Sequence, residues 1–310
     1  MLSVLVQVPK LDCPIYELEK SKVPGENRDM VGLKLTIIYC NYTSKQSLPH
    51  PNHHKHNHNH HHHQNAPQKN PHHPQRRTHL PPQNLHQHRP QPTGFFLTEL
   101  AKPLSKLLSA GHEITFASPK GQPPTPDPLS ESLLAFAGNF YERQRENELI
   151  ERMRRENGFS SPRPFFSISD DELRTFAAVF IPGGHAPLTD LGSDKELGRI
   201  LRYFHGENKP TAAICHGPYA LLSTRLGDGG FVYKGYEITC WSDAEEKVME
   251  TVLGGEIEKV EGELRKEGAV MVEGAKEKMG GTTLCRELLT GGNPLAAEEL
   301  GERFVRMVSV

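Results

Sequence analysis

The chain has 310 residues, of which 35% are hydrophobic, and its formal net charge at pH 7 is −2. A charge so close to zero gives no general electrostatic reason to expect nucleic acid as a partner. The five cysteines are odd in number and form no CxxC pair, which favours a reducing compartment over a disulfide framework. We therefore expect a cytoplasmic location, with the nucleus as an alternative. No run approaches the roughly 18 apolar residues of a membrane span, so we expect no membrane partner.

The N-terminal third of the chain gives few structural signals. Residues 1–32 show no clear periodicity, and the start "MLSVLVQVPK" has neither the basic region nor the cleavage pattern of a signal peptide, so we expect none. The run "LKLTIIYC" at 33–40 is typical of a buried strand, and 33–47 is the candidate first strand of the domain.

Residues 48–92 have an unusual composition. They hold 14 of the 18 histidines, mixed with Pro, Asn and Gln and almost no apolar residues. Such a segment buries too little apolar surface to offset its ordering entropy, so we predict a disordered insert. Histidine-rich tracts can bind zinc, copper or nickel, but we expect incidental binding and no functional metal site.

From Gly94 to Val310, helical and strand patterns alternate. This alternation predicts a single α/β domain, a three-layer sandwich around a mostly parallel sheet. The predicted strands lie within residues 112–119, 177–184, 210–215, 235–241 and 268–274, with a strand and turn within 285–294. The predicted helices lie within residues 95–111, 139–158, 194–209, 216–224 and 295–308.

A cysteine–histidine pair stands at one strand–helix junction, in "TAAICHGPYALLS" at 211–223. In an open parallel sheet, ligands gather beyond the carboxyl ends of the strands, where Cys215 and His216 fall. A thiol on such a turn is exposed, and a helix N-terminus lowers its pKa and favours the thiolate. From this stretch alone, a nucleophile and a buried structural cysteine are equally good interpretations.

Two glycines follow the preceding strand, in "IPGGHAPLTDL" at 181–191. Gly183 and Gly184 would let backbone N–H groups approach a substrate oxygen, as an oxyanion hole requires. The alternative is an ordinary glycine turn. His185 is a candidate substrate-binding residue that could equally face solvent.

One glutamate lies among bulky apolar residues in "TGFFLTELAKPL". Burial raises the pKa of a carboxyl group, and a raised pKa would suit Glu99 for proton transfer near neutral pH. The alternative is an exposed glutamate in the first turn of a helix, favoured there by the helix dipole.

Four motifs together suggest a family. "FFLTELAKPL", "FIPGGHAPLTDL", "AAICHGPYALL" and "LLTGGNPLA" occur in the order and approximate spacing of the PfpI/ThiJ superfamily. From residue 94 to residue 310 the chain most resembles the glyoxalase III-like branch, also described as the heat-shock-protein-31-like chaperones. The resemblance implies a flavodoxin-like three-layer α/β/α sandwich related to class I glutamine amidotransferase domains.

The resemblance also implies roles for individual residues. Cys215 matches the nucleophilic cysteine of the family, His216 the adjacent histidine, and Glu99 the glutamate that touches the thiol. Backbone N–H groups near Gly184, and at Tyr219 or His216, would hold the oxyanion.

The third member of the family's triad is an acidic residue that orients the histidine and follows the next strand. In "EITCWSDAEEK" the best match is Glu246, ahead of Glu245 and Asp243. The family usually joins its first strand to the glutamate helix by a modest loop. Here residues 48–92 occupy that connection, or else the start of the chain is unrelated sequence, as a misassigned gene model would produce.

The function that the resemblance implies is a glutathione-independent glyoxalase. Such a lyase, also called a D-lactate dehydratase, converts methylglyoxal, a small dicarbonyl, to D-lactate through a cysteine hemithioacetal, with no metal or organic cofactor. One alternative is a stress-induced holdase chaperone that binds unfolded clients and uses its cysteine as a redox sensor. Another is a cysteine peptidase or amidase. Because members of the family often dimerise, a homodimer is a further expectation.

Overall fold

A mostly parallel sheet runs through the part of the chain that the computed structural model describes, which is Ser3–Gln7, Lys34–Ile38, and residues 94–226, 229–253 and 256–309. These residues all belong to one compact unit. The predicted insert at 48–92 lies outside the described residues. Among the described helices, none combines the length and the apolar character needed to cross a bilayer.

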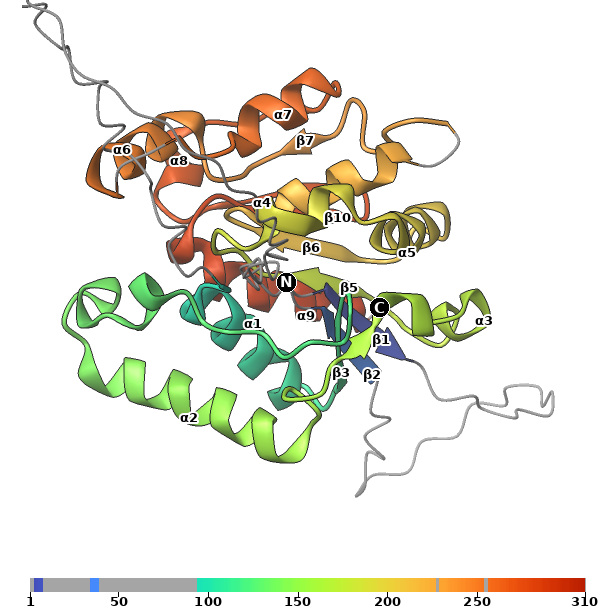
Figure 1. The fold of residues 1–310 in the computed structure, drawn as a ribbon, viewed down its shortest axis with the longest axis horizontal. Coiled ribbons are helices and arrows are strands. Elements are labelled where there is room, and N and C mark those ends of the chain that lie inside the picture. The colour runs from blue at the N-terminus through green and yellow to red at the C-terminus, as the bar shows by residue number, and fades with distance from the viewer. Residues whose placement is uncertain (1–2, 8–33, 39–93, 227–228, 254–255, 310) are drawn as a thin grey trace, which may run out of the picture. The chain divides into compact units, whose positions relative to one another are not determined.

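The sheet has the strand order β4-β3-β1-β2-β5-β6-β10-β9. Figure 1 labels β1, β2, β3, β5, β6 and β10 of this sheet. Strand β2 pairs in parallel with β3 and β5, β3 pairs in parallel with β4, and the parallel run continues from β5 through β6 to β10. Only β1 and β9 pair antiparallel with their neighbours among the described strands. The strands are β1 Ser3–Gln7, β2 Lys34–Ile38, β3 Glu113–Ser118, β4 Arg163–Pro164, β5 Val179–Ile181, β6 Thr211–Ile214, β9 Thr282–Cys285 and β10 Leu288–Gly291.

A second, two-stranded sheet pairs β7 (Glu237–Ile238) in parallel with β8 (Val270–Met271). The α-helices are α1 Leu97–Ser109, α2 Phe140–Glu156, α3 Asp170–Leu173, α4 Pro187–Asp190, α5 Lys195–Gly206, α6 Asp243–Leu253, α7 Val260–Lys266, α8 Ala275–Lys278 and α9 Ala297–Val308. The 3₁₀ helices are η1 Pro128–Glu131, η2 Leu133–Phe136, η3 Phe165–Ser167, η4 Leu191–Ser193, η5 Gly217–Leu226 and η6 Pro294–Ala296.

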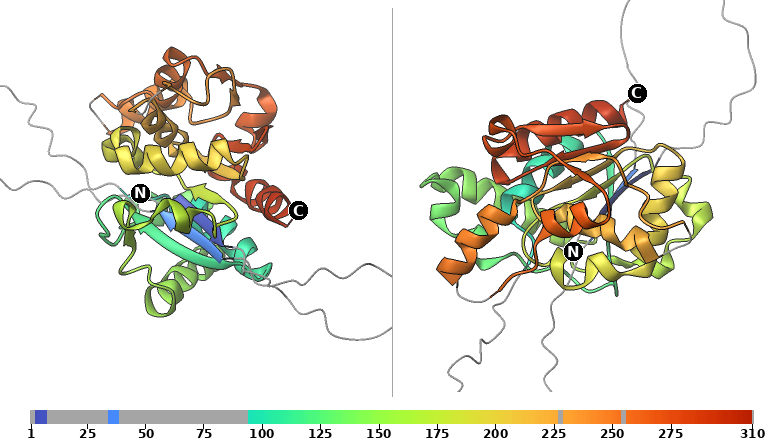
Figure 2. Two further views of the ribbon diagram at one scale, coloured as in Figure 1. Left: turned by 90° about the vertical axis from the view of Figure 1, so that its right-hand side faces the viewer. Right: turned by 90° about the horizontal axis from the view of Figure 1, so that it is seen from above.

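Each face of the main sheet carries its own apolar core. Alternation along β5 places Val179 and Ile181 in the core beneath α5, η5 and α7, whereas Phe180 joins the core beneath α1, α2 and α9. The views in Figures 1 and 2 show these two groups of helices on opposite faces of the sheet. The structure therefore confirms the predicted three-layer α/β/α arrangement.

Helix ends agree with the local sequence signals. The Asp194 carboxylate accepts a hydrogen bond from the Leu197 N–H at the start of α5, and Asn139 accepts one from the Glu142 N–H at the start of α2. Gly111, with φ of 83°, follows the end of α1 in the left-handed region that favours glycine.

Several elements differ from the sequence expectations, and helices α6 and α7 lie where no helix was predicted. A strand at Ser3–Gln7 precedes the one predicted within 33–40, so β2 is the second strand of the chain. The predicted helix at 216–224 is the 3₁₀ helix η5. The pattern at 285–294 is half of a hairpin, in which Arg286 (φ 55°) turns β9 into β10. Five- and four-residue strands are too short to show a periodicity that a sequence pattern can register.

Candidate active site

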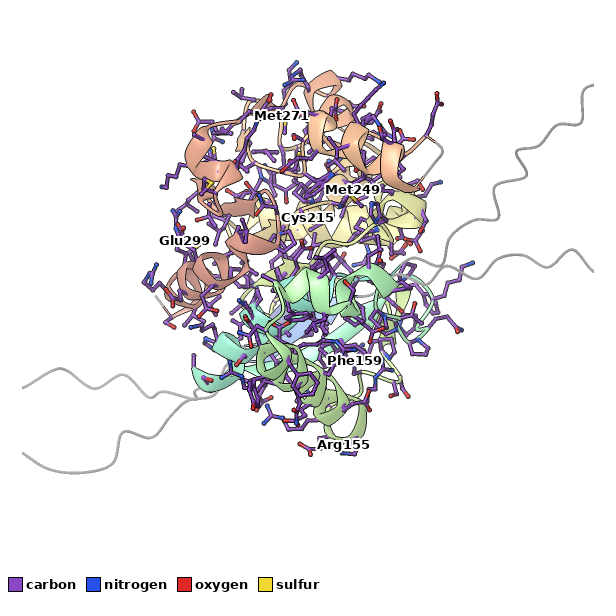
Figure 3. All side chains as sticks on the ribbon, turned by 90° about the vertical axis from the view of Figure 1, so that its left-hand side faces the viewer. Arg155, Phe159, Cys215, Met249, Met271 and Glu299 are labelled. Carbon is purple, nitrogen blue, oxygen red and sulfur yellow. The ribbon has the colours of Figure 1, made fainter. Side chains whose placement is uncertain are left out.

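The backbone at the end of β6 turns sharply at Cys215. Its φ is +60°, a left-handed conformation that costs a non-glycine residue about 1–2 kcal/mol. Two hydrogen bonds hold the turn: the Cys215 N–H donates to the Gly291 carbonyl at 2.8 Å, and the Trp241 N–H donates to the Cys215 carbonyl at 2.9 Å. Figure 3 shows Cys215 near the middle of the view, whereas Arg155 and Met271 lie toward the periphery. This strained, doubly anchored turn is typical of a nucleophile elbow.

His216 contacts the thiol on one side and a carboxylate on the other. Its Nδ1 lies 3.2 Å from Cys215 Sγ, and its Nε2 lies 2.7 Å from Glu246 Oε2. All three side chains are buried. Because an ionised carboxylate can only accept a hydrogen bond, Nε2 carries the proton and Nδ1 presents its lone pair to the thiol. The arrangement allows His216 to take the Cys215 proton.

Of the three acidic candidates, Glu246 is the one that reaches His216. The Glu245 carboxylate instead accepts hydrogen bonds from the Ser242 N–H at 3.0 Å and from the Ser242 hydroxyl at 2.6 Å, forming a cap at the start of α6. The Asp243 carboxylate accepts a hydrogen bond from a backbone N–H of α7 at 3.2 Å. These contacts direct the other two carboxylates away from the histidine.

Glu99 lies in the first turn of α1 and is fully buried. Burial raises the pKa of its carboxyl to about 8, although the Cys215 thiol and the charge of His185 oppose that rise. Among the described residues, neither carboxyl oxygen has a hydrogen-bond partner of good geometry. Glu99 is therefore a mostly protonated acid at neutral pH, placed to exchange a proton beside the thiol.

The Gly183 position is closed to any larger residue. A Cβ added there would lie 2.1 Å from Glu99 Oε2 and 2.6 Å from Cys215 Cβ. Gly184, with φ of 91°, packs against the start of α1, where an added Cβ would lie 2.7 Å from the Phe96 nitrogen. The two glycines thus let the loop after β5 lie directly between α1 and the thiol.

The expectation of an acidic thiol is wrong. Burial raises the pKa of Cys215, and so does the neighbouring Glu99 carboxyl. The backbone N–H groups of Gly184 and His216 oppose that rise, and their role as oxyanion donors stays a prediction. The Tyr219 N–H donates to the His216 carbonyl at 3.0 Å, at the start of η5, so it is engaged within the backbone and not directed at an oxyanion. The expectation failed because it assumed an exposed thiol, whereas this one is 4% exposed.

His185 lies beside His216 and between two carboxylates. Its Nδ1 is 3.3 Å from Asp127 Oδ2, its Nε2 is 3.6 Å from Glu246 Oε1, and its ring centroid is 4.5 Å from that of His216. Burial alone would lower the pKa of His185, but the two carboxylates raise it to about 9. His185 is therefore a cation at neutral pH.

Sequence reasoning missed Asp127. The residue precedes a proline at the start of η1 and accepts a hydrogen bond from the Leu129 N–H at 3.0 Å, so its sequence context indicates only a helix cap. Its other carboxyl oxygen faces His185, from a different loop. A single sequence cannot show that a helix-capping aspartate also contacts a histidine from another loop.

His185, His216 and Glu246 also offer donor atoms within 4.8 Å of one another. A protonated imidazole has no nitrogen lone pair for a metal, and His216 already donates to Glu246. We therefore interpret the group as an ion-paired network. That the protein uses no metal or cofactor stays a prediction, as do the catalytic roles of the residues above.

Known proteins are similar to this chain in sequence. The family model described as ThiJ/PfpI family-like matches residues 91–239. The protein/nucleic acid deglycase HchA of Pseudomonas aeruginosa is 29% identical over 225 residues, which cover 68% of this chain and 71% of that protein. The protein of the same name from Staphylococcus aureus (strain MW2) is 28% identical over 229 residues, which cover 69% and 71%.

Solved structures show the same fold. The crystal structure of glyoxalase III from Candida albicans has a TM-score of 0.59 and 22% identity, with 70% of this chain and 89% of that chain covered. The Rapid Encystment Protein 24 KDa of Francisella tularensis has a TM-score of 0.60 and 20% identity, with 71% and 92% covered. Motifs, fold and relatives thus agree: residues 91–239 match the ThiJ/PfpI family-like model, and the chain is similar in sequence to the HchA deglycases.

Proposed function

We propose that this protein is a glutathione-independent glyoxalase that converts methylglyoxal to D-lactate. One observation carries the proposal: the fully buried carboxyl of Glu99, with its pKa raised to about 8, lies beside the Cys215 thiol. A nucleophile next to a group that can both take and return a proton suits the isomerisation of a dicarbonyl. The HchA relatives and the glyoxalase III neighbour support a role in this chemistry.

The reaction begins with addition of the thiol to the aldehyde. The sulfur of Cys215 attacks the aldehyde carbon while His216 Nδ1 takes the thiol proton, and the product is a hemithioacetal. The developing oxyanion would lie against the N–H groups of Gly184 and His216, which lower the pKa of the thiol. Glu246 keeps the imidazole in the required tautomer and balances its charge.

Proton transfer then moves the oxidation level from one carbon to the other. The ionised Glu99 carboxylate removes the proton on the former aldehyde carbon, giving an enediol, and returns a proton to the neighbouring carbon. The hemithioacetal carbon becomes a thioester as its hydroxyl loses a proton, and the former ketone oxygen gains one to become the hydroxyl of lactate. Water hydrolyses the thioester to lactate and restores the thiol. The sum is methylglyoxal plus water to lactate, so no external oxidant or reductant is required.

The assay is lactate formation from methylglyoxal without glutathione, followed by enzymes specific for each lactate isomer. We expect D-lactate from the full chain and none above background from Cys215→Ser or Glu99→Gln. In D₂O, lactate should gain deuterium at its C2 carbon whenever the proton on Glu99 exchanges with solvent before its return. Absence of lactate from a folded, reduced preparation would refute the proposal.

A second candidate is a deglycase, because the curated relatives carry that name. A deglycase would attack methylglyoxal that is already attached to an amine or thiol. The test compares the rate of adduct loss with the rate at which the adduct releases methylglyoxal spontaneously. At saturating enzyme, a glyoxalase cannot exceed that spontaneous rate, whereas a deglycase can.

A further inference from the structure

A second histidine outside the Cys215–His216 pair shares the same buried carboxylate. The two oxygens of Glu246 face different imidazoles: Oε2 lies 2.7 Å from His216 Nε2, and Oε1 lies 3.6 Å from His185 Nε2. On its other side, His185 Nδ1 meets Asp127 Oδ2 at 3.3 Å. A series of contacts therefore leads from the Cys215 thiol through His216, Glu246 and His185 to Asp127 at the start of η1.

The charges of the side chains in this series of contacts differ from one to the next. Burial would raise the pKa of Glu246, but the two histidines lower it to about 2. The pKa of His185 is about 9, for the reasons given above. The pKa of His216 is lowered by burial first, and the charge of His185 lowers it further against the pull of Glu246 and Asp127. At neutral pH, a fixed cation therefore lies beside a neutral base.

We propose that His185, held in place by Asp127, is a positioning residue whose fixed positive charge keeps His216 unprotonated and so ready to accept the Cys215 proton. The proposal rests on the proposed role of Cys215 as the nucleophile. It assigns the second histidine an electrostatic task in place of the substrate contact expected from the sequence. Its 4.5 Å ring separation from His216 puts the charge close enough to act.

The groups that face His216 act with different signs. A cation beside it opposes protonation, whereas anions favour it. The titratable groups around it are Cys215 in its own turn, Glu246 from α6, His185 from the loop after β5, Asp127 from the start of η1, and Glu99 from α1 across the thiol. Removing the cation and removing its partner carboxylate should therefore shift the protonation of His216 in opposite directions.

The experiment measures how fast iodoacetamide alkylates Cys215 at pH 4.5 to 9, with peptide mass spectrometry to separate this thiol from the other four. The acid limb of the profile reports protonation of His216. In the full chain, His185→Gln should move this limb to higher pH by about one unit. Asp127→Asn should move it to lower pH, because the cation then acts on His216 without its counter-charge. His185→Lys keeps the positive charge, so its acid limb should shift by no more than about half as much as that of His185→Gln.

A matched control is His205→Gln. His205 also pairs with a buried carboxylate, Glu287, at 2.8 Å, but it lies at the end of α5 away from the thiol, so its loss should leave the limb unchanged. Circular dichroism checks that each variant is folded. The proposal is overturned if the limbs of the wild type and His185→Gln coincide, or if His185→Gln and Asp127→Asn shift in the same direction. Because alkylation needs no dicarbonyl, this result does not depend on whether the protein is a glyoxalase.

Discussion

The Nε2 atom of His216 lies 2.7 Å from Oε2 of Glu246, and both side chains are buried. This contact fixes which imidazole nitrogen faces the thiol. If Glu246 became an amide, its NH₂ group could donate to Nε2, and the proton would then sit on Nδ1, where it blocks transfer from Cys215.

We therefore expect Glu246→Gln to lower kcat/KM for methylglyoxal by about 10²- to 10⁴-fold while the fold is kept. Glu245→Gln is the matched control. It removes part of a helix cap, so it should cost about 0.5–1 kcal/mol of stability and leave turnover near the wild-type value. Steady-state kinetics and thermal unfolding of both variants measure the contrast. Equal losses of activity in the two would contradict the assignment.

Cys215→Ser should abolish dicarbonyl turnover and leave the fold intact. A neutral hydroxyl is a poor substitute for a thiol in attack on an aldehyde, and loss of a nucleophile usually costs several orders of magnitude. Cys240→Ser serves as the control, since this cysteine is also buried and free. A residual rate above about a tenth in the first variant would rule out covalent catalysis by this thiol.

The raised pKa of Glu99 predicts opposite pH effects on activity and on stability. Activity should increase as the pH rises through about 8, because Glu99 must be ionised to remove the substrate proton. The folded protein binds this proton more tightly than the unfolded chain does, so ionisation destabilises the fold. Between the unfolded value of 4.5 and the folded value of about 8, stability is lost progressively.

Glu99→Gln should remove that loss. The variant should be inactive but more stable than the wild type, by roughly 4 kcal/mol at pH 8, with the difference vanishing below pH 4.5. Urea unfolding at several pH values gives the comparison. A stability difference that does not change with pH would mean that Glu99 does not titrate as described.

The space beside Gly183 predicts a steric effect on the site. In Gly183→Ala, the new methyl group would overlap both the Glu99 carboxyl and the Cys215 Cβ, so it should destabilise the fold by about 1–3 kcal/mol and remove most activity. The control is Gly206→Ala in α5, where an added Cβ meets nothing within 4 Å. That variant should be neutral or slightly stabilising. Thermal midpoints and turnover decide between them.

Deletion of residues 48–92, with a short flexible linker in their place, should leave activity within about threefold. The composition of the segment gives no core, and loop closure costs only about 0.6 kcal/mol per doubling of length. Turnover and thermal midpoint of the deletion and of the full chain are compared with and without a chelator. A chelator effect confined to the full chain would instead show that the histidines bind a functional metal.

Sequence patterns located the residues of the site better than they described its chemistry. Cys215, His216 and Glu99 stand in compact motifs at element ends, and these motifs already imply a shared edge of the sheet. Asp127 has no such motif, because a cap residue is common and its contact with His185 depends on two loops meeting in space. The pKa of the thiol was predicted in the wrong direction because burial depends on the packing of the whole domain.

The prediction of the fold likewise succeeded where local sequence patterns suffice and failed where distant segments decide. Helix α5, with an apolar stripe and an aspartate cap, was predicted almost to its ends. Strand β1 was missed because five residues within a stretch lacking periodicity cannot indicate pairing. Local signals therefore sufficed where a segment is long or capped, and pairing partners distant in the chain decided the rest.

The two backbone hydrogen bonds of Cys215 make the site depend on segments that lie far apart in the sequence. The carbonyl that anchors its N–H belongs to Gly291, and the N–H that anchors its carbonyl belongs to Trp241. Both residues, and Glu246 as well, lie beyond residue 239, where the match to the family model ends. A shortened product that stopped there would still hold three of the four family motifs, yet it would lack the residues that anchor the turn at Cys215. A fragment that carries recognisable motifs can therefore still be unable to form the active site.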